Sequence, residues 1–144
     1  MTLIIGYGNT LMGDDGFGIY LTRKLQKKVD NSNVNFILTY QLTPELSYEI
    51  KDFKKVIFID ASYGTSNFSI ACPLMSDINS TLISHHLNPK SLIEITNQLF
   101  NVSIEFEIYS VLVEEFKMQE QLSIEMNKPL NEILKYLEKD LINF

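Results

Sequence analysis

The sequence predicts an α/β fold in which a doubly wound, mostly parallel sheet of about five strands has helices on both faces. Short β-type apolar runs alternate with segments of helical periodicity along the chain, as in layered α/β proteins. Residues 56–59 are apolar on both faces, as the centre of a parallel sheet requires. A chain of 144 residues with 45% hydrophobic content buries a core but is too short for two ordinary domains. We therefore expect residues 1–144 to form a single domain.

Three strands and two helices are expected in the first half of the chain. The strands are residues 3–5, 34–38 and 56–59. A helix from residue 15 to about residue 29 is indicated because Phe17, Leu21 and Leu25 recur on one face. A second helix is predicted to begin with Thr43 as the N-cap and Pro44 in the first helical position.

The pattern is weaker beyond Gly64, where residues 68–72 and 81–83 are interpreted as short strands or extended segments. Asn88 and Pro89 open a helix that carries apolar residues at positions 92, 95 and 99. Residues 104–113 alternate between apolar residues and Glu or Ser, which predicts an outer strand. Apolar residues at 130, 133, 134, 137 and 141 predict a C-terminal helix. Pro129 either lies near its first turn or kinks a helix that begins at Ser123.

Charge and cysteine content exclude several classes of protein. Twelve basic and eighteen acidic residues leave a net charge of −6. The sequence has no basic stripe of the kind that nucleic-acid-binding proteins carry. The cluster Arg23, Lys24, Lys27 and Lys28 has the spacing of a solvated helix face. The single Cys72 cannot form an internal disulfide and is interpreted as a small buried residue. No charged segment precedes a long apolar run, and no run approaches the roughly 20 apolar residues of a membrane span. We expect a cytoplasmic monomer without nucleic-acid or membrane partners.

Five of the six glycines lie between residues 6 and 18, which indicates a backbone that turns tightly or approaches something closely. A dinucleotide fingerprint requires G-x-G-x-x-G at a helix N-terminus. The glycines at 6, 8 and 13 do not match that spacing, and Asp14 and Asp15 at the helix entrance would repel a phosphate. A P-loop is excluded because no Gly-Lys-Ser/Thr follows. The cluster therefore does not predict a nucleotide site.

A metal site is the alternative that the acidic residues favour. Asp15, Asp60 at the end of a strand, and one of the adjacent His85 and His86 would supply two carboxylates and one imidazole, a set that suits nickel or zinc. Three protein ligands leave positions open for water or a substrate carbonyl. Each residue also has a structural explanation. Asp14 or Asp15 would cap the helix, and the two histidines would lie in a surface turn. For Asp60, a structural role and a ligand role both stay open. The aromatic Tyr7 is interpreted as core or rim packing.

Three blocks of the chain, in order, resemble the hydrogenase maturation proteases, the endopeptidases that process the large subunit of nickel–iron hydrogenases. The opening block is similar to the family signature G-x-G-N…D-[DE]-G-x-G and reads Gly6-Tyr7-Gly8-Asn9-Thr10-Leu11-Met12-Gly13-Asp14-Asp15-Gly16-Phe17-Gly18. The second and third blocks read Ile57-Phe58-Ile59-Asp60-Ala61 and Ser84-His85-His86-Leu87.

The resemblance implies a three-layer α/β/α sandwich around a twisted sheet, and a metal-dependent endopeptidase of the kind classed as aspartic-type. It matches Asp15, Asp60 and His85 to the metal-contacting and catalytic positions, with His86 the less favoured neighbour. The implied substrate is a large-subunit precursor that already carries nickel, from which a short C-terminal peptide is removed. Nickel is then supplied by the substrate. Held by the precursor's thiolates, it would complete its shell with the three residues and polarise the scissile carbonyl, lower the pKa of a bound water, or both.

The expected substrate contacts are Gly8, Asn9 and Gln41. The glycine turn lets backbone groups lie close to the cleaved strand. Many relatives carry an Asp-Gly-Gly-Thr-type segment after the second strand, whereas residues 41–46 here read Gln-Leu-Thr-Pro-Glu-Leu, and Gln41 would offer an amide to the substrate peptide. Two other functions stay open: a maturation factor that binds nickel or the precursor without cutting, and a peptidase of the same fold that acts on another protein.

Overall fold

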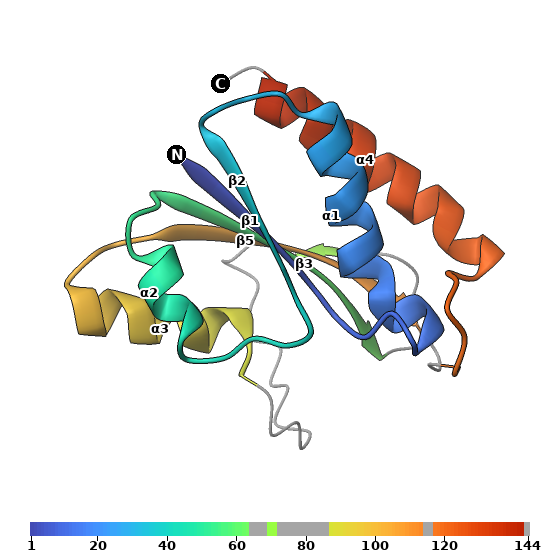
Figure 1. Ribbon diagram of the computed structural model, residues 1–144, viewed down its shortest axis with the longest axis horizontal. Coiled ribbons are helices and arrows are strands. Elements are labelled where there is room, and N and C mark those ends of the chain that lie inside the picture. The colour runs from blue at the N-terminus through green and yellow to red at the C-terminus, as the bar shows by residue number, and fades with distance from the viewer. Residues whose placement is uncertain (64–68, 72–86, 114–116, 143–144) are drawn as a thin grey trace.

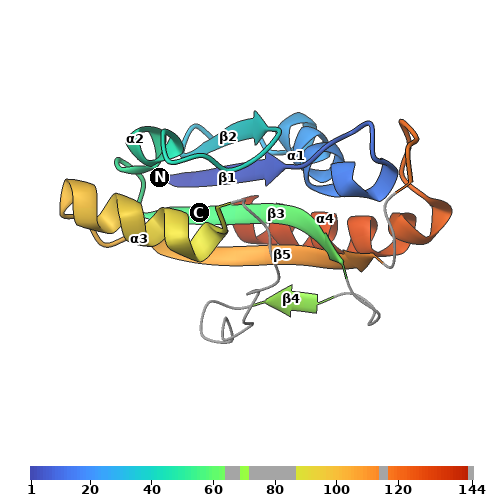
Figure 2. The same ribbon diagram turned by 90° about the horizontal axis from the view of Figure 1, so that it is seen from below.

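A five-stranded sheet forms the centre of the computed structural model, which describes residues 1–63, 69–71, 87–113 and 117–142. The strands lie in the order β2-β1-β3-β5-β4 (Figure 2), and all are parallel except β4, which pairs antiparallel with β5. Their bounds are Thr2–Tyr7 for β1, Val34–Thr39 for β2, Lys55–Tyr63 for β3, Ser69–Ala71 for β4 and Glu105–Val113 for β5. The predicted mostly parallel sheet is confirmed. The strand predicted over residues 104–113 is confirmed as β5, but its predicted outer position is wrong, because β5 lies between β3 and β4.

Helices cover both faces of the sheet, so the three-layer α/β/α sandwich is confirmed (Figure 1). One face carries α1 (Phe17–Lys28), which follows the 3-10 turn η1 (Gly13–Gly16), and α4 (Asn127–Ile142), which follows the 3-10 turn η3 (Ile124–Met126). The other face carries α2 (Leu46–Ile50) and α3 (Pro89–Phe100).

Two hydrophobic cores result, because successive side chains of a strand point to opposite faces. On β3, Ile57 and Ile59 pack with α1 and α4, whereas Val56 and Phe58 pack with α2 and α3. All four side chains are fully buried. Burial on both sides explains why this segment is apolar throughout.

Of two predicted helix starts, the one at Asn88 is confirmed and the one at Thr43 is wrong. Asn88 caps α3 as predicted, since its Oδ1 accepts a hydrogen bond of 2.8 Å from the Ser91 amide. Helix α2 begins at Leu46, and its start carries no side-chain cap. The Leu46 amide donates to the Thr43 carbonyl at 3.1 Å, so the residues predicted to start the helix form a turn before it.

The C-terminal helix resolves the two alternatives for Pro129. Helix α4 starts at Asn127 after the separate turn η3, which places the proline in the first helical turn. There its missing N–H costs little, because the first-turn amides have no partner within the helix.

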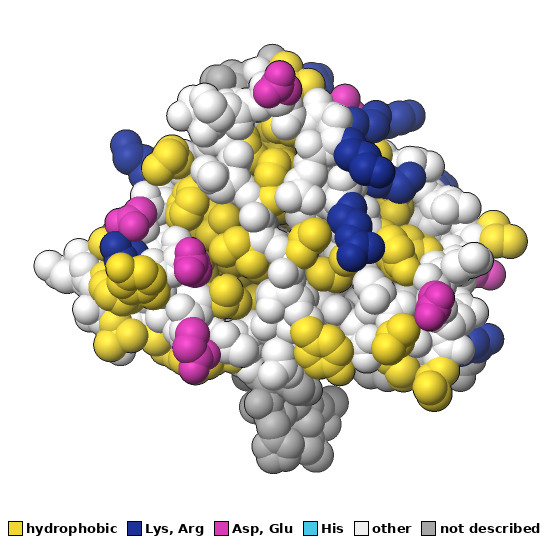
Figure 3. Space-filling view, viewed as in Figure 1, with side chains coloured by type: hydrophobic (Ala, Val, Ile, Leu, Met, Phe, Trp, Pro, Cys, Tyr) yellow, Lys and Arg dark blue, Asp and Glu magenta, His cyan; other side chains and the backbone are white. Residues whose placement is uncertain are grey.

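The basic cluster on α1 is a solvated helix face, as predicted. Its four cationic side chains are exposed, and the dark blue groups gather along α1 in Figure 3. No helix of the described residues is long and apolar enough to cross a membrane. The interpretations of Cys72, residues 81–83, His85 and His86 concern positions outside the described residues.

Candidate functional site

The candidate site lies at the carboxyl end of β1, where the pairing of β1 with β3 stops. From β1 the chain crosses by α1 to β2 on one side, and later returns to β3 on the other side. Ligands of open α/β sheets bind in the crevice at such a reversal of strand order. Tyr7 is the last residue of β1. Asp60 directly follows Ile59, which is the last residue of β3 that pairs with β1. The topology therefore places both side chains at this crevice.

Asp60 and Tyr7 form the central contact of the site. The Tyr7 hydroxyl donates a hydrogen bond of 2.6 Å to Oδ2 of Asp60. The other carboxylate oxygen, Oδ1, is buried and has no hydrogen-bond partner among the described residues. A buried oxygen without a donor is costly, and a cation or a proton donor removes that cost. The sequence predicts only a packing role for Tyr7. Its position at the end of β1, on the same edge as Asp60, was the signal that could have revealed it.

The environment shifts the acidity of both groups. Burial raises the pKa of Asp60, the negative charge of Asp15 raises it further, and the hydroxyls of Tyr7 and Ser110 oppose these effects. Burial and the charge of Asp60 raise the pKa of Tyr7 well above its usual value. Tyr7 therefore keeps its proton at neutral pH and donates a hydrogen bond to Asp60, whereas burial disfavours the charged form of Asp60. A neighbouring cation would favour the charged form.

Asp15 belongs to the same site. Its Oδ2 accepts a hydrogen bond of 2.7 Å from the Asn9 amide, which fixes the carboxylate against the turn after β1. Its charge raises the pKa of both Asp60 and Tyr7. The structure thus brings together the two carboxylates that the sequence singles out. Their role as metal ligands stays a prediction.

Two glycines allow this close arrangement. Gly8 has φ +143°, and a Cβ there would lie 2.0 Å from the carbonyl oxygen of Asp15. A Cβ on Gly18 would lie 2.1 Å from the Ile59 carbonyl oxygen and 2.7 Å from that of Tyr7. At both positions the close approach is to the protein's own backbone. Gly18 lets α1 rest directly on the strand ends that carry the site.

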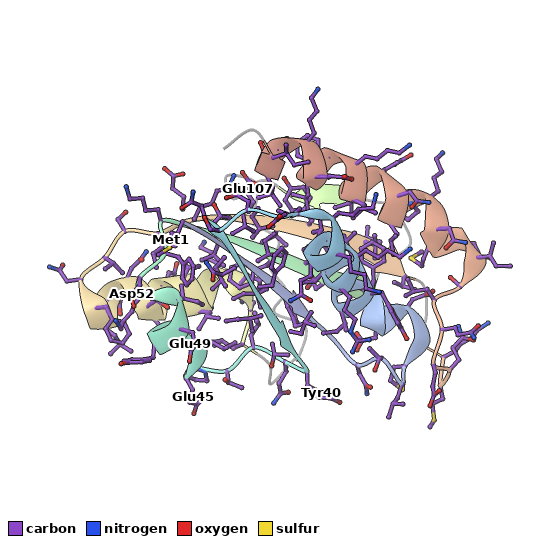
Figure 4. The ribbon with its side chains drawn as sticks, turned by 45° about the horizontal axis from the view of Figure 1, so that its top comes forward. Met1, Tyr40, Glu45, Glu49, Asp52 and Glu107 are labelled. Carbon is purple, nitrogen blue, oxygen red and sulfur yellow. The ribbon has the colours of Figure 1, made fainter. Side chains whose placement is uncertain are left out.

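Asn9 and the segment after β2 adjoin each other beside these carboxylates. Asn9 Oδ1 accepts from the Leu11 amide at 3.0 Å, and its Nδ2 donates to the Tyr40 hydroxyl at 3.3 Å. Tyr40 is labelled at the end of β2 in Figure 4. Gln41 is exposed, and its carbonyl oxygen accepts from the Thr39 hydroxyl at 3.1 Å. The expected contacts of Gly8, Asn9 and Gln41 with a substrate stay predictions.

The first-helix aspartates do not act as helix caps, so that interpretation is wrong. The N-cap of α1 is Gly16, and no side chain caps either α1 or η1. Asp14 is buried, and its carboxylate accepts hydrogen bonds of 2.7 Å from both the amide and the hydroxyl of Ser123. Asp14 therefore ties the site loop to the segment before α4. The two adjacent aspartates have different roles.

The donor atoms of the site fit part of a divalent cation shell. Two carboxylates, one with a buried oxygen that has no hydrogen-bond partner in the described part of the chain, match the oxygen ligands that such cations take. No group of three His, Cys, Asp or Glu side chains that could hold a metal occurs within residues 1–63, 69–71, 87–113 and 117–142. His85, the expected nitrogen ligand, and its neighbour His86 lie outside these ranges.

Comparison with known proteins identifies the fold. No family model and no curated protein matches the chain. Among solved structures, the NiFe hydrogenase maturation protease HycI from Thermococcus kodakarensis matches with a TM-score of 0.77 and 22% identity, over 97% of this chain and 91% of that one. The hydrogenase maturating endopeptidase HybD from E. coli matches with a TM-score of 0.75 and 16% identity, over 99% and 92%. The hydrogenase 2 maturation peptidase from a Thaumarchaeota archaeon has a TM-score of 0.66 and 23% identity, over 97% of each chain. The chain thus has the fold of the hydrogenase maturation proteases.

Proposed function

We propose that this protein is a hydrogenase maturation endopeptidase that removes the C-terminal extension from a nickel-loaded large-subunit precursor. The observation that carries the proposal is the pair Asp15 and Asp60 at the crevice between β1 and β3, in which a buried oxygen of Asp60 accepts no hydrogen bond from any residue that the structure describes. The pair lies in a fold shared with proteins named as hydrogenase maturation proteases. Fold alone does not establish activity, so the acidic site supplies the chemical argument.

The carboxylates explain how the enzyme would select its substrate. Burial and like charge disfavour an ionised Asp60 in the free protein. A cation brought by the substrate pairs with that charge, whereas a nickel-free precursor leaves it unpaired. The protein therefore binds the loaded precursor better, and proteolysis follows metal insertion.

The same residues place the substrate's nickel next to the peptide that is cut. Asp15 and Asp60 contribute oxygen ligands, and His85 contributes the nitrogen ligand. A divalent ion so placed polarises the scissile carbonyl or lowers the pKa of a neighbouring water molecule. Asn9 and Gln41, on the adjoining segments, bind the extended peptide through their amides.

The decisive experiment compares nickel-loaded with nickel-free precursor. Each is incubated with the protein, and the mass of the large subunit is followed by mass spectrometry. We expect loss of the C-terminal peptide only from the loaded form. Asp15→Asn, Asp60→Asn and His85→Ala should each lower kcat/KM on the order of 100-fold. Asp30→Asn is the matched control, since it removes an exposed carboxylate from the loop between α1 and β2, at the opposite end of the sheet.

Each other outcome overturns the proposal in an identifiable way. Cleavage that is indifferent to nickel, or that survives the three substitutions, contradicts nickel-dependent proteolysis. A stable complex with an uncut loaded precursor indicates a non-cleaving maturation factor. Cleavage of a different protein, with the precursor left intact, indicates a peptidase of the same fold with another substrate.

A further inference from the structure

The Tyr7 side chain is held at both of its ends. Its ring packs against the hydrophobic core beneath α2 and α3. Its hydroxyl donates the 2.6 Å hydrogen bond to Oδ2 of Asp60, from the neighbouring strand. Because packing and strand pairing fix the ring, the position of the hydroxyl is fixed relative to β3.

This contact makes the two oxygens of Asp60 unequal. Oδ2 accepts the 2.6 Å hydrogen bond of the Tyr7 hydroxyl, whereas Oδ1 is buried and accepts no hydrogen bond of ordinary geometry from the described residues. The Ser110 hydroxyl lies near enough to the carboxylate to lower its pKa, but it forms no such bond with Oδ1. The terminal torsion of an aspartate is broad and roughly two-fold, so the side chain by itself does not prefer one oxygen over the other. The hydrogen bond removes that freedom. A carboxylate held in this way offers a cation a single oxygen in a defined direction.

We propose that Tyr7 is a positioning residue, whose hydroxyl holds Oδ2 of Asp60 so that Oδ1 is the oxygen offered to the nickel of the precursor. The inference rests on the proposed function and deepens it, because it names the residue that prepares Asp60 for the metal. Hydrogen bonds that orient ligating side chains contribute about 10- to 100-fold to metal affinity or activity. Tyr7 is expected to act at that scale without itself touching the metal.

The test is Tyr7→Phe, which removes the hydroxyl and keeps the ring that packs in the core. The readout is nickel selectivity, defined as the affinity for nickel-loaded precursor divided by the affinity for nickel-free precursor, measured by surface plasmon resonance. We expect selectivity to fall about 10- to 100-fold, with binding of the nickel-free precursor unchanged. A role confined to fold stability would weaken binding of both forms equally.

Tyr109→Phe is the matched control. The Tyr109 hydroxyl also donates to a carboxylate, Oε2 of Glu107, at 2.9 Å, but its ring belongs to the core under α1 and α4. Glu107 lies toward the amino ends of the strands, away from the end of β2 where Tyr40 is labelled (Figure 4). This variant loses the same kind of hydrogen bond and should keep wild-type selectivity.

A double variant tests whether Tyr7 acts through Asp60. In an Asp60→Asn background, Tyr7→Phe should cause no further loss of selectivity. An additional loss in that background would contradict positioning through Asp60. Wild-type selectivity in Tyr7→Phe, with normal cleavage by the wild-type protein, overturns the inference and leaves the proposed function standing. A wild-type protein that neither cleaves nor discriminates between the precursors overturns both.

Discussion

Alanine at position 18 should destabilise the protein, because Gly18 is the point where α1 rests on the backbone of two strands. The new Cβ would lie 2.1 Å from the Ile59 carbonyl oxygen and 2.7 Å from the Tyr7 carbonyl oxygen, whereas ordinary contact begins near 3.4 Å. Both obstacles are backbone atoms, so α1 must move away by about 1 Å. Such overpacking costs about 3 kcal/mol at the upper end of its usual range. The better helix propensity of alanine returns about 1 kcal/mol, which leaves a net loss of about 2 kcal/mol.

Thermal unfolding followed by far-UV circular dichroism measures this effect. For a domain of this size, the loss corresponds to a Tm lower by about 6–8 °C. Gly16→Ala is the control, because the same change there meets its nearest neighbours, Thr10 and Tyr20, only at 3.0 Å. We expect that variant to lose no more than about 1 kcal/mol. Equal Tm values for the two variants, or a Gly18→Ala protein as stable as wild type, would refute the role assigned to Gly18.

Three further predictions concern single side chains. Burial raises the pKa of Asp60 above its unfolded value, so its contribution to stability is present at low pH and is lost as pH rises through the folded-state pKa. Metal-free Asp60→Asn should therefore melt above wild type at neutral pH, with a difference that shrinks on acidification; a Tm at or below wild type would contradict this. Asp14→Ala breaks both hydrogen bonds to Ser123 and should cost about 3 kcal/mol in urea unfolding, against roughly half for Ser123→Ala; equal losses would show that the two bonds are not separate. Asn88→Ala removes the cap of α3 and should lower the free energy of unfolding by about 1 kcal/mol. Asn88→Ser keeps a capping oxygen and should change that free energy by only about 0.3 kcal/mol. No loss in the alanine variant would contradict the capping role.

The elements that were predicted well carry local information. The β3 segment is apolar on both faces because two cores enclose it, and the Asn88 cap follows from a short-range preference for that residue type. The errors have a non-local origin. Whether β5 is an outer strand depends on where β4 pairs, and alternation within residues 104–113 carries no information about that partner. The start of α2 moved because a backbone turn at Thr43 competes with the helix.

The candidate site divides in the same way. Asp15 and Asp60 could be selected from the sequence because one lies in a glycine-rich loop and the other follows the apolar run of residues 56–59. The predicted strand end at Asp60 is wrong, since β3 continues to Tyr63, but the pairing of β3 with β1 stops at Ile59. The residues that contact the aspartates could not be predicted from the sequence. Tyr7 and Asp60 are 53 residues apart, and Asp14 and Ser123 are 109 apart, so each contact depends on strand register or helix docking.

Residue type and short-range spacing were enough to predict the α/β class, the two-faced burial of the central strand and an acidic loop that does not suit a phosphate. The different partners of the two neighbouring aspartates, by contrast, follow from the tertiary structure. The adjacent Asp14 and Asp15 are chemically identical, and the 3-10 turn η1 sends one carboxylate to Ser123 and leaves the other beside Asn9 and the charge of Asp60. That separation arises from backbone geometry and distant partners, which no local pattern in the chain encodes.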